Sequence, residues 1–153
     1  MTQIEFYSVA DIKTEGEPDS PLPSKLPYNH LCEVIKRAYR KGQKVFIHTD
    51  NRRLAERIDE LLWSNDSKSF LPHHLAGEDT ESVPPIEIGF GQEPSVRPDV
   101  LVNLGQDVPL FFSHFQWVFE YAYGDEESKE KARSRFRFYR ERGYPLNHRQ
   151  IQS

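Results

Sequence analysis

The sequence contains very little cysteine. Cys32 is the only one among 153 residues, so no disulfide can form within the chain. No cysteine pair and no His-x-x-x-His spacing supplies the ligands of a closed zinc site. We therefore expect neither a metal nor another cofactor. Cys32 lies in a segment of helical periodicity, beside its apolar face, where a lone thiol is normally a packing residue.

Long apolar runs are also absent. No stretch approaches the roughly 20 apolar residues that cross a bilayer. The first nine residues lack the basic and then apolar pattern of a secretory signal. We expect a cytoplasmic protein with no membrane partner. Hydrophobic residues make up 37% of the chain and charged residues 29%, which is the composition of a folded chain, and the length predicts a single α/β domain over residues 1–153.

Short apolar stretches alternate with segments of helical spacing. The sequence predicts strands over residues 4–9, 44–49, 86–90 and 99–104, and helices over 28–41, 52–62 and 126–142. Asp50 is expected to cap the second helix, while Gly143 and Pro145 end the third. Residues 110–123 predict a short turn of helix followed by a strand. A proline-rich loop is expected over residues 11–27 and an aromatic-bearing loop over residues 63–85.

This order of elements predicts the fold class. Strands alternating with helices indicate an α/β fold with a mixed, largely parallel sheet and helices on both faces. Such Rossmann-like sheets often hold nucleotides, but residues 10–14 (Ala-Asp-Ile-Lys-Thr) contain no glycine for a phosphate to approach. No Gly-x-x-x-x-Gly-Lys occurs anywhere in the sequence. We therefore expect no glycine-rich phosphate-binding loop.

Basic residues are concentrated in the last predicted helix. Residues 129–142 hold seven Lys or Arg and two Glu, a net charge of +5 in a chain of net charge −4, so the remaining residues sum to −9. At 100° per residue, Ala132, Phe136 and Tyr139 form an apolar stripe. The stripe is flanked on one side by Arg133, Arg137 and Arg140, and on the other by Arg135 and Arg142. This surface is suited to a partner that is both anionic and apolar.

The predicted loop over residues 63–85 carries large apolar side chains. Trp63 follows the second predicted helix, and Phe70, Leu71 and Leu75 lie among turn-forming residues. Two interpretations stay open. These side chains fold back onto the sheet, or they form a protein-binding surface in which a central Trp contributes about 2 kcal/mol or more.

Several blocks of sequence support a family resemblance. Residues 69–78 read Ser-Phe-Leu-Pro-His-His-Leu-Ala-Gly-Glu, preceded by Leu62-Trp63 and followed by Pro-Ile-Glu-Ile at 85–88. Asp-Val-Leu-Val-Asn-Leu at 99–104, the block from 132 to 147 and Phe6-Tyr7 agree in order and spacing. Over nearly the whole chain the sequence resembles the chi subunit of bacterial DNA polymerase III. The resemblance implies a clamp-loader accessory protein without chemistry of its own, which pairs with the psi subunit and holds the C-terminal tail of single-stranded DNA-binding protein.

The resemblance also implies roles for individual residues. The psi subunit would pack on Trp63, Phe70, Leu71 and Leu75. The acidic tail, which ends in a hydrophobic residue with a free carboxylate, would bind Arg133, Phe136, Arg137, Tyr139 and Arg140, with Ala122 at the adjoining strand end. Family members often have Tyr where this chain has Phe136, so any bond of that hydroxyl is missing here. The guanidinium of Arg137 would support the tail in place of a lysine.

Three other interpretations compete with this one. The arginines could form an ordinary solvated helix face, or they could bind single-stranded DNA directly with the help of aromatic rings. The net charge of −9 elsewhere argues against stable binding of a long polyanion. An α/β enzyme is the third interpretation, with His73, His74, Asp50 and Asp99 as candidate groups. Each has an ordinary explanation, and no pair of nucleophile and base stands out.

Overall fold

The computed structural model describes residues 2–9, 26–64, 73–75, 85–94 and 99–151. Within these ranges the strands are β1 (Gln3–Val9), β2 (Val45–His48), β3 (His73–Leu75), β4 (Ile86–Gly89), β5 (Val100–Asn103), β6 (Trp117–Ala122) and β7 (Leu146–Ile151). The helices are α1 (Tyr28–Arg40), α2 (Arg52–Ser64) and α3 (Glu126–Glu141), with a 3-10 helix η1 (Phe112–His114) before β6.

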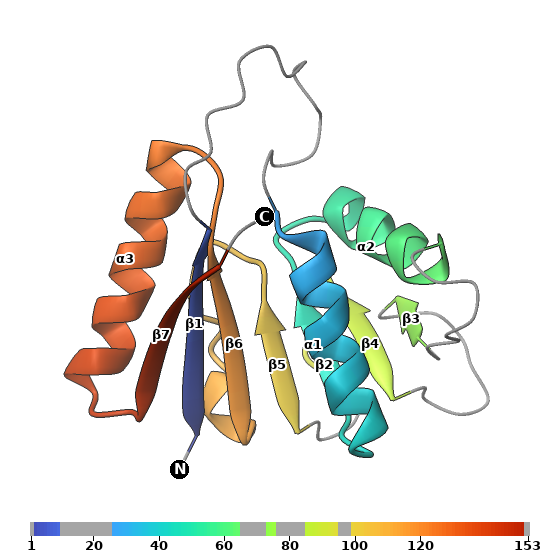
Figure 1. The fold of residues 1–153 in the computed structure, drawn as a ribbon, viewed down its shortest axis with the longest axis horizontal. Helices are drawn as coiled ribbons and strands as arrows, with labels where there is room; N and C mark the ends of the chain where they lie inside the picture. Colours follow the sequence, from blue (N-terminus) through green and yellow to red (C-terminus); the bar gives the residue numbers. More distant parts are fainter. Residues whose placement is uncertain (1, 10–25, 65–72, 76–84, 95–98, 152–153) are drawn as a thin grey trace.

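The strands form one sheet in the order β3-β4-β2-β5-β6-β1-β7, with every described pairing parallel. β1 is an inner strand, because Ile4 pairs with Val118 of β6 on one side and with Leu146 of β7 on the other. β3 and β7 are the two edges (Figure 1). The predicted α/β fold with a largely parallel sheet is confirmed.

One face of the sheet is covered by α1 and α2. Successive side chains of a strand point to opposite faces, so Ile47, Ile88 and Val102 share this face. They pack in one buried cluster with Ile35 of α1 and Ile58 of α2, all of them 0 to 1% exposed. Cys32 belongs to the same cluster and is 3% exposed, which confirms its packing role.

The opposite face is covered by α3 and η1. Phe46, Leu101 and Val118 point to this side, where they pack with Phe112 of η1 and Tyr139 of α3. Figure 1 shows α3 on the β1, β6 and β7 side of the molecule, away from α1 and α2. The prediction of helices on both faces is therefore confirmed.

The residue that caps α2 differs from the one that the sequence predicted. Asn51, and not Asp50, caps α2, because its Oδ1 accepts from the Leu54 N–H at 2.8 Å. Asp50 accepts instead from the N–H of Gln106, in the loop after the neighbouring strand β5, at 2.8 Å. At α3 the cap is Asp125, whose Oδ1 accepts from the Ser128 N–H at 2.8 Å.

Three further details concern the predicted loops and the chain end. The turn of helix and strand predicted over residues 110–123 are present as η1 and β6. The loop predicted over 63–85 is wrong in part, because Trp63 lies in the last turn of α2 and residues 73–75 form β3. The edge strand β7 was not predicted. Residues 10–25, most of the predicted proline-rich loop, lie outside the described residues.

Candidate functional site

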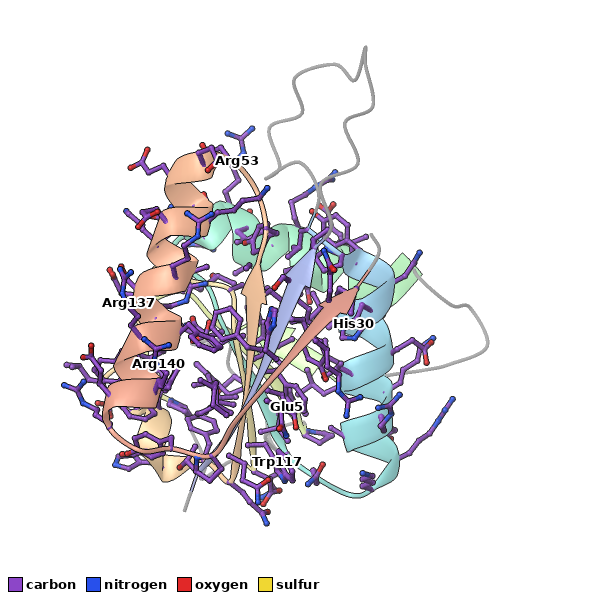
Figure 2. The ribbon with its side chains drawn as sticks, turned by 60° about the vertical axis from the view of Figure 1, so that its left-hand side comes forward. Glu5, His30, Arg53, Trp117, Arg137 and Arg140 are labelled. Atoms are coloured by element: carbon purple, nitrogen blue, oxygen red, sulfur yellow. The ribbon has the colours of Figure 1, made fainter. Side chains whose placement is uncertain are left out.

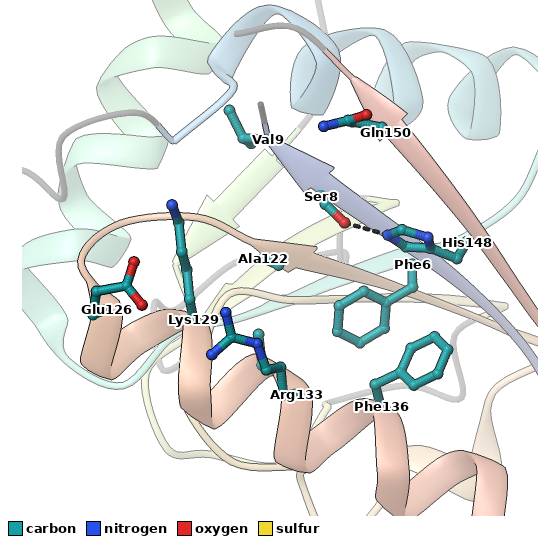
Figure 3. A pocket seen from close by; sticks show the side chains of 11 residues that line it. Phe6, Ser8, Val9, Ala122, Glu126, Lys129, Arg133, Phe136, His148 and Gln150 are labelled. Carbon is teal, nitrogen blue, oxygen red and sulfur yellow. Dashed lines mark hydrogen bonds between the residues drawn. The ribbon is translucent and has the colours of Figure 1, made fainter. Parts of the chain in front are cut away.

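A cleft with a volume of about 500 Å³ lies between α3 and the strands β1 and β7. It exists because α3 packs over β6 and leaves the cleft-facing side chains of the edge strand uncovered. The lining comprises Phe6, Ser8 and Val9 of β1, Ala122 of β6, Glu126, Lys129, Ala132, Arg133 and Phe136 of α3, and His148 and Gln150 of β7 (Figure 3).

The floor of the cleft is apolar. Phe6 is 3% exposed and Ala132 is 1% exposed. The half-buried ring of Phe136 meets Phe6 edge to face, with ring centroids 5.4 Å apart. Edge-to-face aromatic contacts are favourable beyond the area they bury, so this floor is suited to an additional apolar or aromatic side chain.

The helix side of the cleft carries two cationic side chains, Lys129 and Arg133, and one acidic residue, Glu126. Lys129 and Arg133 extend from α3 towards the strands (Figure 3). Arg133 Nη1 pairs with Glu130 Oε2 at 2.7 Å, but the two side chains are 56% and 61% exposed. An exposed pair of this kind contributes about 0 to 1 kcal/mol, so an anionic ligand can compete for the guanidinium.

The strand side of the cleft is polar. Ser8 Oγ and His148 Nε2 form a hydrogen bond between the neighbouring strands β1 and β7. The imidazole also packs against the rings of Phe136 and Phe6, at centroid distances of 6.1 and 6.5 Å. Gln150 continues this wall two residues further along β7.

Buried polar contacts fix α3 on the sheet beneath the cleft. The Glu120 carboxylate of β6 is 0% exposed. It accepts from Arg135 Nε at 2.9 Å, from the Tyr139 hydroxyl at 2.6 Å and from Asn103 Nδ2 at 2.9 Å. Arg135 also donates to the carbonyl oxygens of Gln106 and Tyr121, at 2.8 and 3.1 Å. These contacts attach α3, which carries Lys129 and Arg133, to strand β6 of the sheet.

The same burial shifts the pKa values of two groups in this network. Burial raises the pKa of the Glu120 carboxyl, while the Arg135 guanidinium and the hydrogen bonds from Tyr139 and Asn103 act in the opposite direction. Burial, and after it the neighbouring Glu120, raises the pKa of the Tyr139 hydroxyl. Tyr139 therefore stays protonated and donates to Glu120.

The structure brings together half of the six residues predicted to bind an acidic tail. Ala122, Arg133 and Phe136 line the cleft. Arg137 and Arg140 lie on the exposed side of α3 beside it (Figure 2), where Arg140 is 5.9 Å from the centre of the Phe136 ring. Tyr139 is 0% exposed and turned into the core, so the prediction that it contacts a ligand is corrected.

Arg135 is a second correction on α3. The helical projection placed it on the surface flank of the apolar stripe, but it is 6% exposed and bound to Glu120. Sequence reasoning also missed Phe6, Ser8, His148 and Gln150 as cleft residues. Phe6 had been noted within its strand, whereas the polar sequence of β7 gave little signal of a strand.

The residues predicted for the second surface are described in part. Trp63 lies on α2, and Leu75 of β3 is half-buried against the cluster beneath α1 and α2. Phe70 and Leu71 lie outside the described residues. α2 and β3 adjoin one another at the edge of the sheet opposite to β7 (Figure 1).

The acidic residues considered for an enzyme lie at opposite ends of the sheet. Asp50 follows β2 at the carboxyl edge, whereas Asp99 precedes β5 at the amino edge, where it accepts from the Lys44 N–H at 2.8 Å. His73 and His74 lie in β3. In the described part of the chain, no three His, Cys, Asp or Glu residues are placed to hold a metal ion. None of the helices in those ranges has the length and apolarity required to span a bilayer.

The geometry thus defines an α/β protein with a cleft that has an apolar floor and cationic side chains, and comparison with known proteins gives its family. The sequence profile described as "DNA polymerase III chi subunit, HolC" matches residues 1–147. DNA polymerase III subunit chi of Pseudomonas aeruginosa is 34% identical over 149 residues, which cover 95% of this chain and 94% of that protein. The subunits chi of Escherichia coli and Haemophilus influenzae are 35% and 36% identical, each over 76% of this chain and over 80% and 81% of their own lengths.

The chain belongs to the DNA polymerase III chi subunit family. The resemblance found in the sequence is therefore confirmed. Membership makes the protein an accessory subunit of a replicative polymerase and not itself the catalyst, which confirms that prediction as well.

Proposed function

We propose that this protein is an adaptor of the clamp loader, which holds the C-terminal tail of single-stranded DNA-binding protein in the cleft along α3 and the psi subunit on the surface around Trp63. The observation that carries the proposal is the cleft itself. It combines an apolar floor at Phe6 and Phe136 with the cationic groups of Lys129 and Arg133.

The chemistry of such a tail matches that of the cleft. A tail that ends in a hydrophobic residue presents a side chain and a carboxylate close together, and therefore needs an apolar recess beside a cation. Arg133 supplies the cation and Phe136 the recess, while Arg137 and Arg140 add positive charge for acidic residues upstream of the terminus.

The placement of the second surface supports simultaneous binding. Trp63 and Leu75 belong to α2 and β3 at one edge of the sheet, and the cleft borders β7 at the other edge. Two partners held at once would raise the effective concentration of polymerase at protein-coated template. No cofactor is needed for this function, and a cytoplasmic location stays a prediction.

Direct binding of single-stranded DNA is the second candidate, favoured by the same arginines and rings. The acidic remainder of the chain disfavours it, because a net charge of −9 repels a polyanion that extends beyond α3. A short peptide contacts the helix alone and is repelled less.

The proposal is tested by titrating the protein with an acidic peptide that ends in Phe. Arg133→Ala and Arg137→Ala should each weaken binding, by about tenfold for Arg133, since a hydrogen bond to a charged group contributes roughly 1.5 to 3 kcal/mol. Arg57→Ala is a matched control, because Arg57 also forms an exposed ion pair three residues along a helix, with Glu60 at 3.0 Å. Unchanged affinity in both Arg133→Ala and Arg137→Ala would refute the assignment of the tail site.

The other surface is tested on the same proteins by co-purification with the psi subunit. Trp63→Ala should abolish co-purification with the psi subunit and leave the affinity for the peptide unchanged. Arg133→Ala should weaken peptide binding and leave co-purification with the psi subunit unchanged. Loss of both activities in either single variant would contradict two separate surfaces.

A further inference from the structure

We propose that Ser8 and His148 form a second carboxylate-binding element on the strand side of the cleft, which selects a free chain-terminal carboxylate over its amide. This inference rests on the proposed tail-binding function and deepens it. No role for either residue followed from the sequence.

The pair is built into the sheet. Ser8 of β1 and His148 of β7 lie on neighbouring parallel strands, and their side chains share the cleft face, where Ser8 Oγ and His148 Nε2 are hydrogen-bonded (Figure 3). The rings of Phe6 and Phe136 pack against the imidazole and limit its rotation. Ser8 is half-buried, while His148 is exposed along the cleft.

The hydrogen bond determines what the pair offers to a ligand. When His148 Nε2–H donates to Ser8 Oγ, the hydroxyl proton of Ser8 is left to donate elsewhere. The cleft is the open space beside Ser8, and Arg133 extends towards it from the opposite wall. With His148 in this tautomer, a ligand between the walls meets a guanidinium on one side and a hydroxyl donor on the other.

A carboxylate is the group that satisfies both walls. Its two oxygens accept hydrogen bonds in different directions, so one can bind Arg133 and the other Ser8. A carboxamide has a single acceptor oxygen, and its NH₂ group would face a donor. The helix arginines alone would attract any anion, whereas donors on both walls discriminate a free carboxyl terminus from an amidated one.

The experiment compares two peptides of the same acidic, Phe-terminated sequence, one with a free carboxyl terminus and one amidated. The measured quantity is the ratio of their dissociation constants. The wild-type protein should favour the free acid by about tenfold or more. Ser8→Ala and His148→Phe should each reduce this preference by roughly three- to tenfold, and affinity for the amidated peptide should stay nearly constant.

A comparison of two variants of His148 separates hydrogen bonding from packing. His148→Phe keeps a ring against Phe6 and Phe136, whereas His148→Gln keeps an N–H donor for Ser8 and should restore part of the preference. Asn147→Ala is the matched control on β7, because Asn147 points to the other face and donates to Glu5 at 3.1 Å. It should leave the ratio unchanged.

Each remaining outcome overturns the inference. A wild-type preference that persists in Ser8→Ala and His148→Phe would refute the pair and leave the proposed function intact. An equal loss of affinity for both peptides would assign the pair to packing of β7 alone. If the wild-type protein binds neither peptide, the proposed tail site fails, and the role of Ser8 and His148 fails with it.

Discussion

Glu120 is the residue on which the position of α3 depends. A carboxylate removed from water costs several kcal/mol unless its charge and lone pairs are satisfied. Here Arg135, Tyr139 and Asn103 satisfy it, and two of these three donors come from α3. The helix is therefore held by polar contacts as well as by its packing on an apolar cluster.

Removing the Arg135 guanidinium tests how far the stability of the protein depends on its contact with Glu120. We predict that Arg135→Met lowers the free energy of unfolding by about 3 to 5 kcal/mol, because it leaves the Glu120 charge buried without its cation. Urea denaturation followed by circular dichroism measures the change. The double variant Glu120→Leu with Arg135→Met should recover much of the loss, whereas a loss below about 1 kcal/mol in the single variant would contradict the argument.

At the scale of elements, α3 begins at a residue whose ionisation matters. The backbone N–H of Ser128 donates to Asp125, and this hydrogen bond, followed by that of the Ser128 side chain, lowers the pKa of the Asp125 carboxyl. A lowered pKa in the folded state means that the ionised cap stabilises the protein above the ordinary pKa of Asp, near 4. That stabilisation is lost as the pH falls through the folded-state value.

The cap can be tested by its pH dependence. Asp125→Ala should lower the midpoint of thermal unfolding at pH 7, and the difference from wild type should shrink as the pH falls below about 4. Calorimetry at several pH values measures both. Asp125→Asn retains a capping oxygen and should show a smaller deficit at pH 7. A deficit that is independent of pH would show that the ionised form has no special role.

The elements differ in how well the sequence predicts them. The helices were found because their apolar residues recur at helical spacing. The inner strands were found because they are short apolar runs, as in Val100–Asn103, whose four residues are all buried. β7 was missed because Leu146–Ile151 is an edge strand whose four central residues are exposed, so no apolar alternation marks it. β3 spans only three residues within a segment rich in turn formers, which hid it in the same way.

The site was predicted in part for a similar reason. Arg133 and Phe136 follow from the charge and periodicity of one helix. The burial of Arg135 and Tyr139 does not, since it requires knowledge that Glu120 of β6 lies beneath them. Likewise, Ser8 and His148 are 140 residues apart in sequence and meet because β1 and β7 are neighbours.

At the scale of the whole molecule, the uneven charge distribution separates a peptide ligand from a nucleic acid. The basic segment 129–142 carries +5 against −9 elsewhere. A peptide bound in the cleft engages the few cations that line it or lie beside it, whereas a bound strand of DNA would release counterions from many phosphates.

Salt dependence should report which ligand the protein recognises. We predict that the logarithm of the peptide dissociation constant rises with the logarithm of salt concentration with a slope of at most about 2. A protein-free single-stranded oligonucleotide should bind weakly at about 0.15 M salt. Tight oligonucleotide binding with a slope of about 4 or more, lost in Arg133→Ala, would favour the nucleic-acid interpretation instead.

The inner position of β1, between β6 and β7, has a consequence for how the chain folds during synthesis. Its two neighbours are β6 and β7, which end at residues 122 and 151. β1 is synthesised before both of these strands, so it must wait for them before its hydrogen bonds to them can form. Pairing across so much sequence closes slowly, and it makes this half of the molecule the late step of folding during synthesis.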